Sequence, residues 1–439
     1  MGKAGDIPVA GAPRGRTGRC KRILLECTYT HLYGGNTGIQ RVVRNVINNA
    51  ARVGRNLGVQ CQPIVWTGRY FQPTDKVLLQ PKDLRWLIKK LLSVFPDPIP
   101  RALTWLPRKL RLPGFYDRLL GWLVPCIRRL KGDIVTFRAG DVLFLLDFSW
   151  LVPLWPGVQQ AKRSSARVGA TIYDLVPIRF PETCNQELLW MFRKWFEQAC
   201  SQADFFVAIS RTVANECRQH LASLDGGARE GAPVGYFYLG CNLDQRSGAG
   251  PIRPRVRQVL EESSAKPYLS VATLEPRKNH RYLLDAFDKV WSQGVQAPLC
   301  LVGRPGWQCH DIERRIHQHP LLDKRLFLFS DLNDEELLFC YDRAKALIFP
   351  SFYEGFGLPI VEALSRGCRV LASDIPIHRE VGGEYCVYFD LGSPDRLADL
   401  IVGYEKTGRL PPVKPLDGYR WQDWSESCAQ LIRVLMEMA

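Results

Sequence analysis

The sequence predicts two α/β domains, each built on an open parallel sheet, and three observations support this fold class. The chain has 439 residues, which suits two domains of about 200 residues each, and 46% of its residues are hydrophobic. Short apolar runs alternate with helical patterns along most of the chain, as expected for parallel strands joined by crossover helices. Residues 344–369 show the order strand, glycine loop, helix.

Composition argues against several classes of protein. Residues 1–19 are rich in Gly, Pro, Ala and Arg without an apolar core, so we expect a disordered tail and not a signal peptide. No apolar run approaches the roughly 18–20 residues that a membrane-spanning helix needs. Fourteen cysteines without a C-x-x-C pair fit reduced thiols in a cytoplasmic protein. The net charge of +15 predicts an acidic partner.

The first domain begins with a predicted strand over residues 21–30, a glycine loop and a helix from near Ile39. Gly34, Gly35 and Gly38 allow a ligand to approach the backbone closely, and the helix start after them is a potential phosphate site. The loop lacks both the G-x-G-x-x-G pattern and the Lys-Ser/Thr of a P-loop, so dinucleotide and NTPase functions lose support. A tight strand-to-helix turn without ligand is the alternative.

Residues 82–131 have a different character, because tryptophans and leucines alternate there with 12 basic and 3 acidic residues. This pattern predicts a surface that lies on an anionic membrane, with tryptophans at headgroup depth. Two alternatives are an insertion packed on its own domain and a nucleic-acid-binding segment, for which no recognition motif is present. The expected membrane-facing residues are Trp86, Lys89, Lys90, Trp105, Arg108, Lys109, Trp122, Arg128 and Arg129.

Further strands are predicted at residues 141–150, 168–177 and 204–210, with a helix over 187–203. Ligands of open parallel sheets collect at the carboxyl ends of the strands, where Asp174 and Ser210 lie. A carboxylate at such an end can orient or deprotonate an acceptor hydroxyl, although Asp174 can equally be a loop cap. A linker rich in Gly, Pro and Ala is expected near residues 242–262.

The second domain opens with a strand that ends near Thr273, followed by Arg277, Lys278 and a helix after Asn279. Two cations beside a helix start predict a binding site for pyrophosphate that needs no metal. The alternative is that both side chains are simply solvated in a loop. Asp374 and Glu380 are expected in a later loop that faces the same ligand.

Two glutamates with seven residues between them follow the next strand. Glu354 stands in a loop freed by Gly355 and Gly357, and Glu362 falls in a helix predicted over about residues 359–366. The helix start attracts an anion, and carboxylates accept hydrogen bonds from hydroxyls. The pattern predicts a ligand that carries both phosphate and hydroxyl groups, against the alternative of an ordinary helix start.

The string EGFGLPIVEAL resembles the E-x7-E donor site of retaining glycosyltransferases of family 4, which have the GT-B fold. EPRKNH, TGIQRV and YDLVP look most like bacterial mannosyl- and rhamnosyltransferases that build surface polysaccharides such as O-antigen, lipopolysaccharide and capsule. The resemblance is strong over residues 266–439 and weak over 21–240. It implies two Rossmann-like domains facing a cleft, with a C-terminal helix that crosses back to the first domain.

The resemblance also implies roles for individual residues. Glu354 would hold the sugar hydroxyls, Glu362 the ribose, and Lys278, with help from Arg277, the departing diphosphate. Residues 330–333 would border the nucleotide base, but no side chain there indicates which base binds. Thr273 stands where the family usually has an arginine, and Tyr173 where a histidine often precedes the aspartate. Arg41 is a further expected contact, and the expected donor-binding set is Gly35, Gly38, Thr273, Arg277, Lys278, Glu354, Gly355, Phe356, Gly357, Leu358 and Glu362, with Glu354, Lys278 and Asp174 as catalytic residues.

The sequence therefore predicts an N-terminal domain over residues 20–245, a nucleotide-sugar domain over 246–418 and a crossover helix over 419–439. We expect transfer of mannose, or of a deoxyhexose such as rhamnose, from a nucleotide-diphosphate sugar, with a GDP-sugar as the favoured donor. The expected acceptor is a glycan on a polyprenyl diphosphate at the inner face of the plasma membrane. No D-x-D motif is present, so we expect no metal, and we expect no cofactor and no nucleic acid. The alternatives are a GT-B sugar-nucleotide epimerase and a non-catalytic scaffold.

Overall fold

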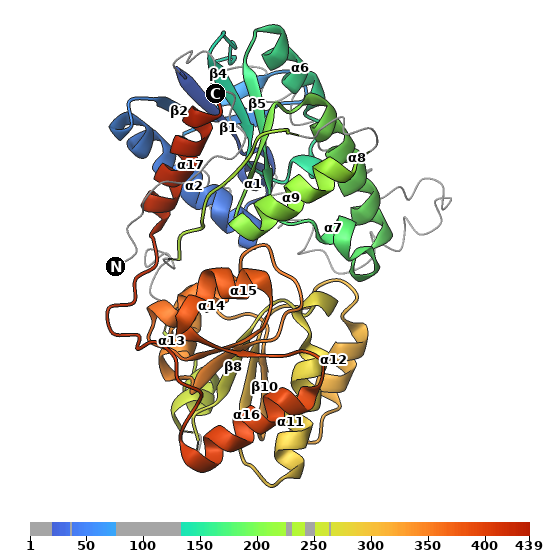
Figure 1. Cartoon of the computed structure of the whole chain (residues 1–439), viewed down its shortest axis with the longest axis vertical. Coiled ribbons are helices and arrows are strands. Elements are labelled where there is room, and N and C mark those ends of the chain that lie inside the picture. The colour runs from blue at the N-terminus through green and yellow to red at the C-terminus, as the bar shows by residue number, and fades with distance from the viewer. Residues whose placement is uncertain (1–19, 36, 76–132, 225–230, 242–250, 263–264) are drawn as a thin grey trace, which may run out of the picture.

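The computed structural model describes residues 20–35, 37–75, 133–224, 231–241, 251–262 and 265–439. These residues form two α/β domains that lie one above the other along the long axis of the molecule (Figure 1). Each domain is built on one open sheet with helices on its faces, so the expected pair of parallel-sheet domains is confirmed.

The N-terminal sheet has seven strands in the order β3-β2-β1-β4-β5-β6-β7. All neighbours pair in parallel except β2 and β3, which pair antiparallel at one edge. Its strands are buried on both faces, which explains their continuous apolar runs. They are β1 (Arg22–Glu26), β2 (Gln60–Trp66), β3 (Phe71–Pro73), β4 (Asp141–Leu145), β5 (Arg167–Ile172), β6 (Phe205–Ala208) and β7 (Val234–Tyr236).

The helices of this domain connect the strands and cover both faces of the sheet. The longest, α2, begins with a capping box in which Thr37 and Gln40 satisfy each other's backbone N–H groups. The helices are α1 (Thr28–Tyr33), α2 (Gly38–Asn56), η2 (Ser149–Leu151), α6 (Trp155–Arg163), α7 (Val176–Arg179), η3 (Pro181–Thr183), α8 (Gln186–Gln202) and α9 (Arg211–Ser223).

The C-terminal sheet has six parallel strands in the order β10-β9-β8-β11-β12-β13. Its strands are β8 (Tyr268–Val271), β9 (Leu299–Val302), β10 (Leu326–Phe329), β11 (Ala346–Phe349), β12 (Val370–Ser373) and β13 (Cys386–Phe389). Its helices are α10 (Pro254–Arg257), η5 (Gln258–Glu262), η6 (Pro276–Lys278), α11 (His280–Ser292), α12 (His310–His317), α13 (Asp334–Arg343), α14 (Leu358–Ser365), α15 (Pro376–Gly382), η7 (Gly383–Tyr385) and α16 (Pro394–Thr407).

The last helix, α17 (Trp424–Glu437), returns to the N-terminal domain and packs on α2 (Figure 1). The Cys428 thiol lies 3.6 Å from the Val46 carbonyl oxygen, and both helices contribute to one hydrophobic core. The predicted crossover helix is therefore confirmed. It begins at residue 424, because residues 419–423 run along residues 238–241 instead: Trp421 Nε1 donates to the Leu239 carbonyl at 2.8 Å.

The first strand is shorter than the sequence predicts. β1 ends at Glu26, and Thr28–Tyr33 forms α1 instead of extending the strand to Thr30. The Glu26 carboxylate accepts from the Thr28 N–H at 2.7 Å, and Asp147 accepts from the N–H and the hydroxyl of Thr30 at 2.6 and 2.7 Å. These carboxylates turn the chain into a helix, which the β-propensity of its threonines and tyrosines does not show.

Three sequence predictions lie outside the described residues: the tail over 1–19, the boundary near 245 and the basic segment 82–131 with its nine membrane-facing residues. Among the described residues, no helix combines the length and the apolar character that crossing a membrane requires. The cysteines in the same part of the chain are buried.

Candidate functional site

The candidate site lies where the strand order of the C-terminal sheet reverses. β8 and β11 are neighbours at its centre, with β9 and β10 on one side and β12 and β13 on the other. Connections leave such a switch point in opposite directions and open a crevice at the carboxyl ends of the strands. η6 follows β8 and the loop over residues 350–357 follows β11, so the fold brings the predicted basic pair to Glu354.

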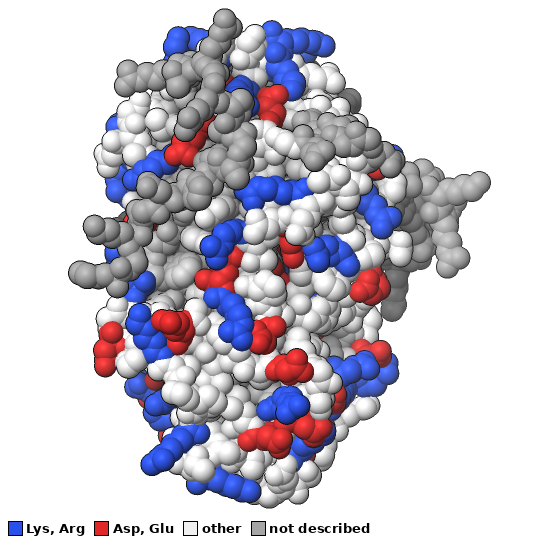
Figure 2. Space-filling view, viewed as in Figure 1, with Lys and Arg blue, Asp and Glu red and all other residues white. Residues whose placement is uncertain are grey.

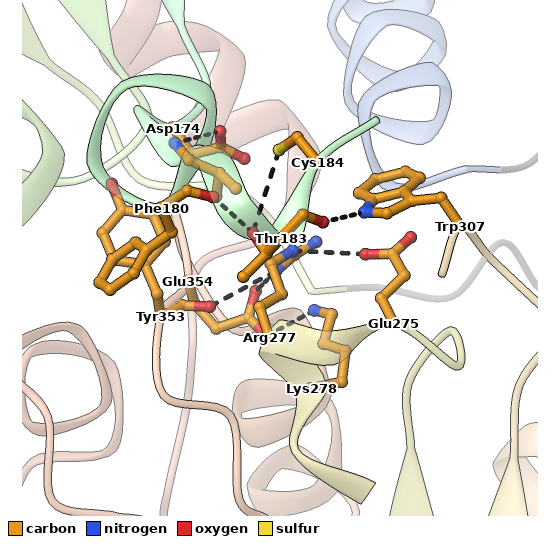
Figure 3. Close-up of polar contacts among 11 residues, drawn as sticks. Asp174, Phe180, Thr183, Cys184, Glu275, Arg277, Lys278, Trp307, Tyr353 and Glu354 are labelled. Atoms are coloured by element: carbon orange, nitrogen blue, oxygen red, sulfur yellow. Dashed lines mark hydrogen bonds and ion pairs between the residues drawn. The ribbon is translucent and has the colours of Figure 1, made fainter. Parts of the chain in front are cut away.

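Glu354 is the centre of this site (Figure 3). Its side chain is only 7% exposed, and its carboxylate pairs with Arg277 Nη1 at 2.7 Å and with Lys278 Nζ. Burial alone would raise the pKa of Glu354, but Lys278 and Arg277 lower it to about 2. Burial and Arg277 in turn lower the pKa of Lys278, against the effect of Glu354. An ionised carboxylate and two cations are thus held together inside the protein.

The second predicted carboxylate, Glu362, lies in α14 and is 3% exposed. It pairs with Arg41 of α2, in the other domain, and accepts a hydrogen bond from the Tyr341 hydroxyl at 3.0 Å. The structure therefore brings Arg41 to the site but joins it to Glu362 rather than leaving it beside the glycine loop. A ligand hydroxyl at Glu362 would share this carboxylate with Arg41.

The glycine loop of the N-terminal domain is partly filled by its own side chains. Gly35 has a φ of +95°, a left-handed conformation that favours glycine. The Gln40 amide donates to the Gly34 carbonyl, and Arg44 donates to the Gly35 carbonyl. Gly38 is the first residue of α2, and the Thr37 side chain caps the helix there. Gln40 and Arg44 thus occupy the two loop carbonyls, and the sequence indicated neither contact.

Asp174 brings the N-terminal domain to the same crevice (Figure 3). It follows β5 and accepts from the Val176 N–H at 3.1 Å, which is the loop cap that the sequence left open. Burial raises the pKa of Asp174, and Arg277 opposes that effect. Tyr173 points away, because its hydroxyl donates to the Leu146 carbonyl at 2.6 Å inside the core. Asp174 is therefore the residue of this pair that remains near Arg277.

Gly355 lies where the backbones of the two domains meet. Its carbonyl accepts from the Ser210 hydroxyl at 2.9 Å. A Cβ built on Gly355 would lie 2.1 Å from the Tyr173 carbonyl oxygen, so only glycine allows the two backbones to meet here. Ser210, which the sequence placed at a strand end, also caps α9 by accepting from the Val213 N–H.

Several other predicted residues have different surroundings from those expected. The Phe356 ring packs on Tyr238 and Trp421 in the core, so its backbone is the part near the crevice. Gly357 caps α14, which starts at Leu358. Glu380 is not in a ligand-facing loop: it lies in α15 and accepts from the Arg211 and Thr212 N–H groups of α9 at 2.7 and 2.8 Å.

Asp374 also differs from the expectation that it faces a ligand, because it pairs with exposed Arg379 of α15. Thr273 is half-buried beside the loop that follows β9, and its methyl group lies close to where a Cβ on Gly306 would stand. The arginine that the family usually has at this position is thus absent from the site, while Arg277 reaches Glu354 from four residues further along.

The structure adds residues that the sequence analysis missed. Glu275 is 6% exposed and pairs with Arg277 Nε at 3.3 Å. Trp307 and Gln308 reach the other domain. Trp307 Nε1 donates to the Thr183 carbonyl at 2.8 Å (Figure 3), and the Gln308 amide donates to the Cys184 carbonyl at 3.0 Å. In the sequence EPRKNH, the acidic residue Glu275 was visible two positions ahead of the basic pair. No pattern in the sequence around Trp307 indicates that this residue contacts the other domain.

Comparison with known proteins identifies the C-terminal part of the chain. Residues 253–409 match the family described as Glycosyl transferases group 1. This segment of the chain is therefore similar to group 1 glycosyl transferases. The matched segment contains the residues that build most of the crevice described above, namely Glu275, Arg277, Lys278, Glu354 and Glu362.

Curated relatives extend the similarity to the N-terminal domain. The chain is 29% identical over 433 residues to the serotype-specific mannosyltransferase WbdA of Escherichia coli, which covers 97% of this chain and 48% of WbdA. It is 34% identical over 212 residues to the O-antigen chain mannosyltransferase RfbU of Salmonella typhimurium, covering 48% of this chain and 53% of RfbU. The chain thus spans about half the length of these relatives.

Solved structures confirm that the two domains form the GT-B fold. Sucrose-phosphate synthase from Thermosynechococcus elongatus superimposes with a TM-score of 0.54 at 17% identity, over 95% of this chain and 94% of that one. Anabaena HepE, in a complex with UDP and glucose, gives a TM-score of 0.52 at 15% identity over the same shares. At such low identity these structures support the fold alone.

Proposed function

We propose that this protein is a retaining, metal-independent hexosyltransferase that moves mannose, or a related deoxyhexose, from a nucleoside diphosphate to a hydroxyl group of a glycan. The main supporting observation is the group formed by buried Glu354 with half-buried Arg277 and Lys278, which lies beside Asp174 where the two domains meet. Two cations suit a diphosphate, and an ionised carboxylate between them suits sugar hydroxyls.

The donor would bind across the carboxyl ends of β8 and β11. Glu362 would accept hydrogen bonds from the ribose, and Glu354 from the hexose hydroxyls. Because the pKa of Glu354 is lowered to about 2, this carboxylate is ionised at neutral pH and acts as an acceptor only. Arg277 and Lys278 would turn from Glu354 to the diphosphate, whose negative charge grows as it leaves. No cofactor beyond the donor enters this scheme.

The transfer itself would proceed at the front face of the donor sugar. The acceptor oxygen forms a bond to the anomeric carbon on the side from which the diphosphate oxygen departs, so the configuration is retained. The acceptor proton passes to the departing phosphate oxygen, which balances the step without a protein nucleophile. Asp174 would orient the acceptor hydroxyl, since it is the carboxylate that the N-terminal domain brings to this crevice.

The relatives support the choice of sugar and product. Two of them carry names that specify mannosyl transfer in O-antigen synthesis, so we propose GDP-mannose as the favoured donor and a bacterial surface polysaccharide as the product. Incubation with GDP-mannose and a mannosylated acceptor should yield a product one hexose heavier by mass spectrometry. Glu354→Ala should lower turnover by about 10- to 100-fold with unchanged circular dichroism, because a buried charged hydrogen bond to substrate is lost. A Glu354→Ala variant that turns over at the wild-type rate would refute the assignment.

We further propose a lipid-linked acceptor and peripheral attachment to the inner face of the plasma membrane. The face in Figure 2 shows acidic and basic residues intermixed on the C-terminal domain, which is unlike a membrane-binding surface of one sign. The excess of basic charge instead falls in residues 82–131, as counted in the sequence. Flotation with liposomes should require anionic lipid and this segment. Equal flotation with neutral vesicles would contradict the proposal.

A further inference from the structure

We propose that Glu275 is a positioning residue that holds Arg277 in place for the donor diphosphate. This inference rests on the proposed function and assigns a role to a residue outside the E-x7-E and basic-pair motifs. Arg277 lies between two carboxylates of its own domain (Figure 3). Its Nη1 meets Glu354 at 2.7 Å, and its Nε meets Glu275 Oε2 at 3.3 Å.

The two carboxylates contact different edges of the guanidinium group. Glu275 contacts Nε, near the stem of the side chain, whereas Glu354 contacts a terminal nitrogen. A sugar that engages Glu354 competes with Arg277 for that carboxylate. The Nε contact does not depend on the sugar, so Glu275 would keep the guanidinium in the crevice while its terminal nitrogens turn to the phosphate oxygens.

Arg277 needs such support because its backbone lies in a short turn and not at the family's usual arginine position. The family's usual arginine position is occupied by Thr273, and Arg277 reaches the site from a short turn, η6. In this turn the Lys278 N–H donates to the Glu275 carbonyl at 3.0 Å, so both cations and Glu275 share one compact unit. A flexible arginine on a turn loses less entropy on binding when a fixed carboxylate has already oriented it.

Glu275 has few other contacts that explain its burial. It is 6% exposed, and its Oε2 accepts no hydrogen bond from the described residues besides the ion pair with Arg277. Burial raises the pKa of Glu275, and Arg277 and then Lys278 oppose that effect. A buried carboxylate is costly unless it is paired, which indicates that the pairing with Arg277 is the reason for its presence.

The loop after β9 fixes the rotamer of Glu275. A Cβ added to Gly306 would stand 2.6 Å from Glu275 Cγ, so the Gly306 backbone lies directly against the glutamate stem. The next two residues, Trp307 and Gln308, bind the N-terminal domain. Contact between the domains and the orientation of Arg277 are therefore connected through Glu275.

The test is a double-mutant cycle on Glu275→Gln and Arg277→Gln, read by calorimetric binding of GDP and GMP. Each single variant should weaken the binding of GDP about tenfold. The affinity for GMP, which lacks the second phosphate, should change by less than about twofold. The double variant should be no weaker than Arg277→Gln alone, because Glu275 acts through Arg277. Glu182→Gln, at an exposed glutamate in η3, is the matched control and should leave both affinities unchanged.

Gly306→Ala supplies an independent arm, since it displaces Glu275 without removing its charge, and it should reproduce the selective loss of GDP binding. Equal weakening of GDP and GMP, or an additive double variant, would overturn the positioning role. Unchanged GDP binding by Glu275→Gln would overturn it while leaving the proposed function intact. A wild-type protein that binds none of GDP, UDP and ADP would overturn the proposed function, and this inference with it.

Discussion

Replacing Gly355 with alanine should stop sugar transfer while each domain stays folded. A Cβ at this position would stand 2.1 Å from the Tyr173 carbonyl oxygen, and Cβ atoms essentially never come within 3.0 Å of another heavy atom. The domains must therefore separate by at least about 0.9 Å locally, because both sides of the contact are backbone and cannot turn away. The bond from the Ser210 hydroxyl to the Gly355 carbonyl, now 2.9 Å, would lengthen to about 3.8 Å and be lost.

A displacement of about 1 Å between donor and acceptor groups lowers a reaction rate by about 100-fold, and we expect that loss in Gly355→Ala. Transfer from radiolabelled GDP-mannose measures the rate, while GDP binding, which uses the C-terminal domain, should weaken by less than about threefold. Gly403→Ala in α16 is the matched control, since a Cβ there meets nothing within 4 Å. A Gly355→Ala enzyme with at least half of the wild-type rate would refute the argument that the domains must touch here.

Two other consequences can be tested directly. Burial and then Asp147 raise the pKa of Glu26 from 4.5 to about 8, so the folded state holds a proton that the unfolded state releases. The free energy of unfolding should therefore fall as pH rises from about 5 to 8 and level off above that. Urea unfolding at a series of pH values measures this dependence. Glu26→Gln should flatten this dependence, and an unaltered slope would mean that Glu26 is ionised in the folded protein. Trp307→Phe removes the 2.8 Å bond to the Thr183 carbonyl, so hydrogen exchange over residues 181–184 should rise about fivefold, with no change over residues 268–271. Unchanged exchange at residues 181–184 would show that this bond does not hold the domains together.

The sequence predicted the parts of the site that local pattern controls. A strand, a loop that contains Glu354 and Gly357, and a helix follow one another within one short stretch. The local sequence pattern was therefore enough to predict this arrangement. Glu354 and Lys278 were both expected at the donor, one for the sugar hydroxyls and the other for the diphosphate, but their direct pairing was not predicted.

Contacts between distant segments could not be predicted in the same way. Arg41 joins Glu362 across 321 residues, and Trp307 meets Thr183 across 124. These contacts depend on how the two domains are placed, which no periodicity encodes. Glu380 was expected to face a ligand, because nothing in its own segment reveals that the start of α9 lies beside it.

The packing of α17 on α2 affects the order in which the protein can fold during synthesis. All six strands of the C-terminal sheet lie between residues 268 and 389, so that domain can assemble its sheet before α17 exists. The N-terminal domain begins first but must wait for residues 424–437 to cover the apolar side of α2. The N-terminal sheet, over residues 22–236, can still form first, but α2 keeps an uncovered apolar surface until α17 has been made, and exposed surface of this kind is what chaperones bind.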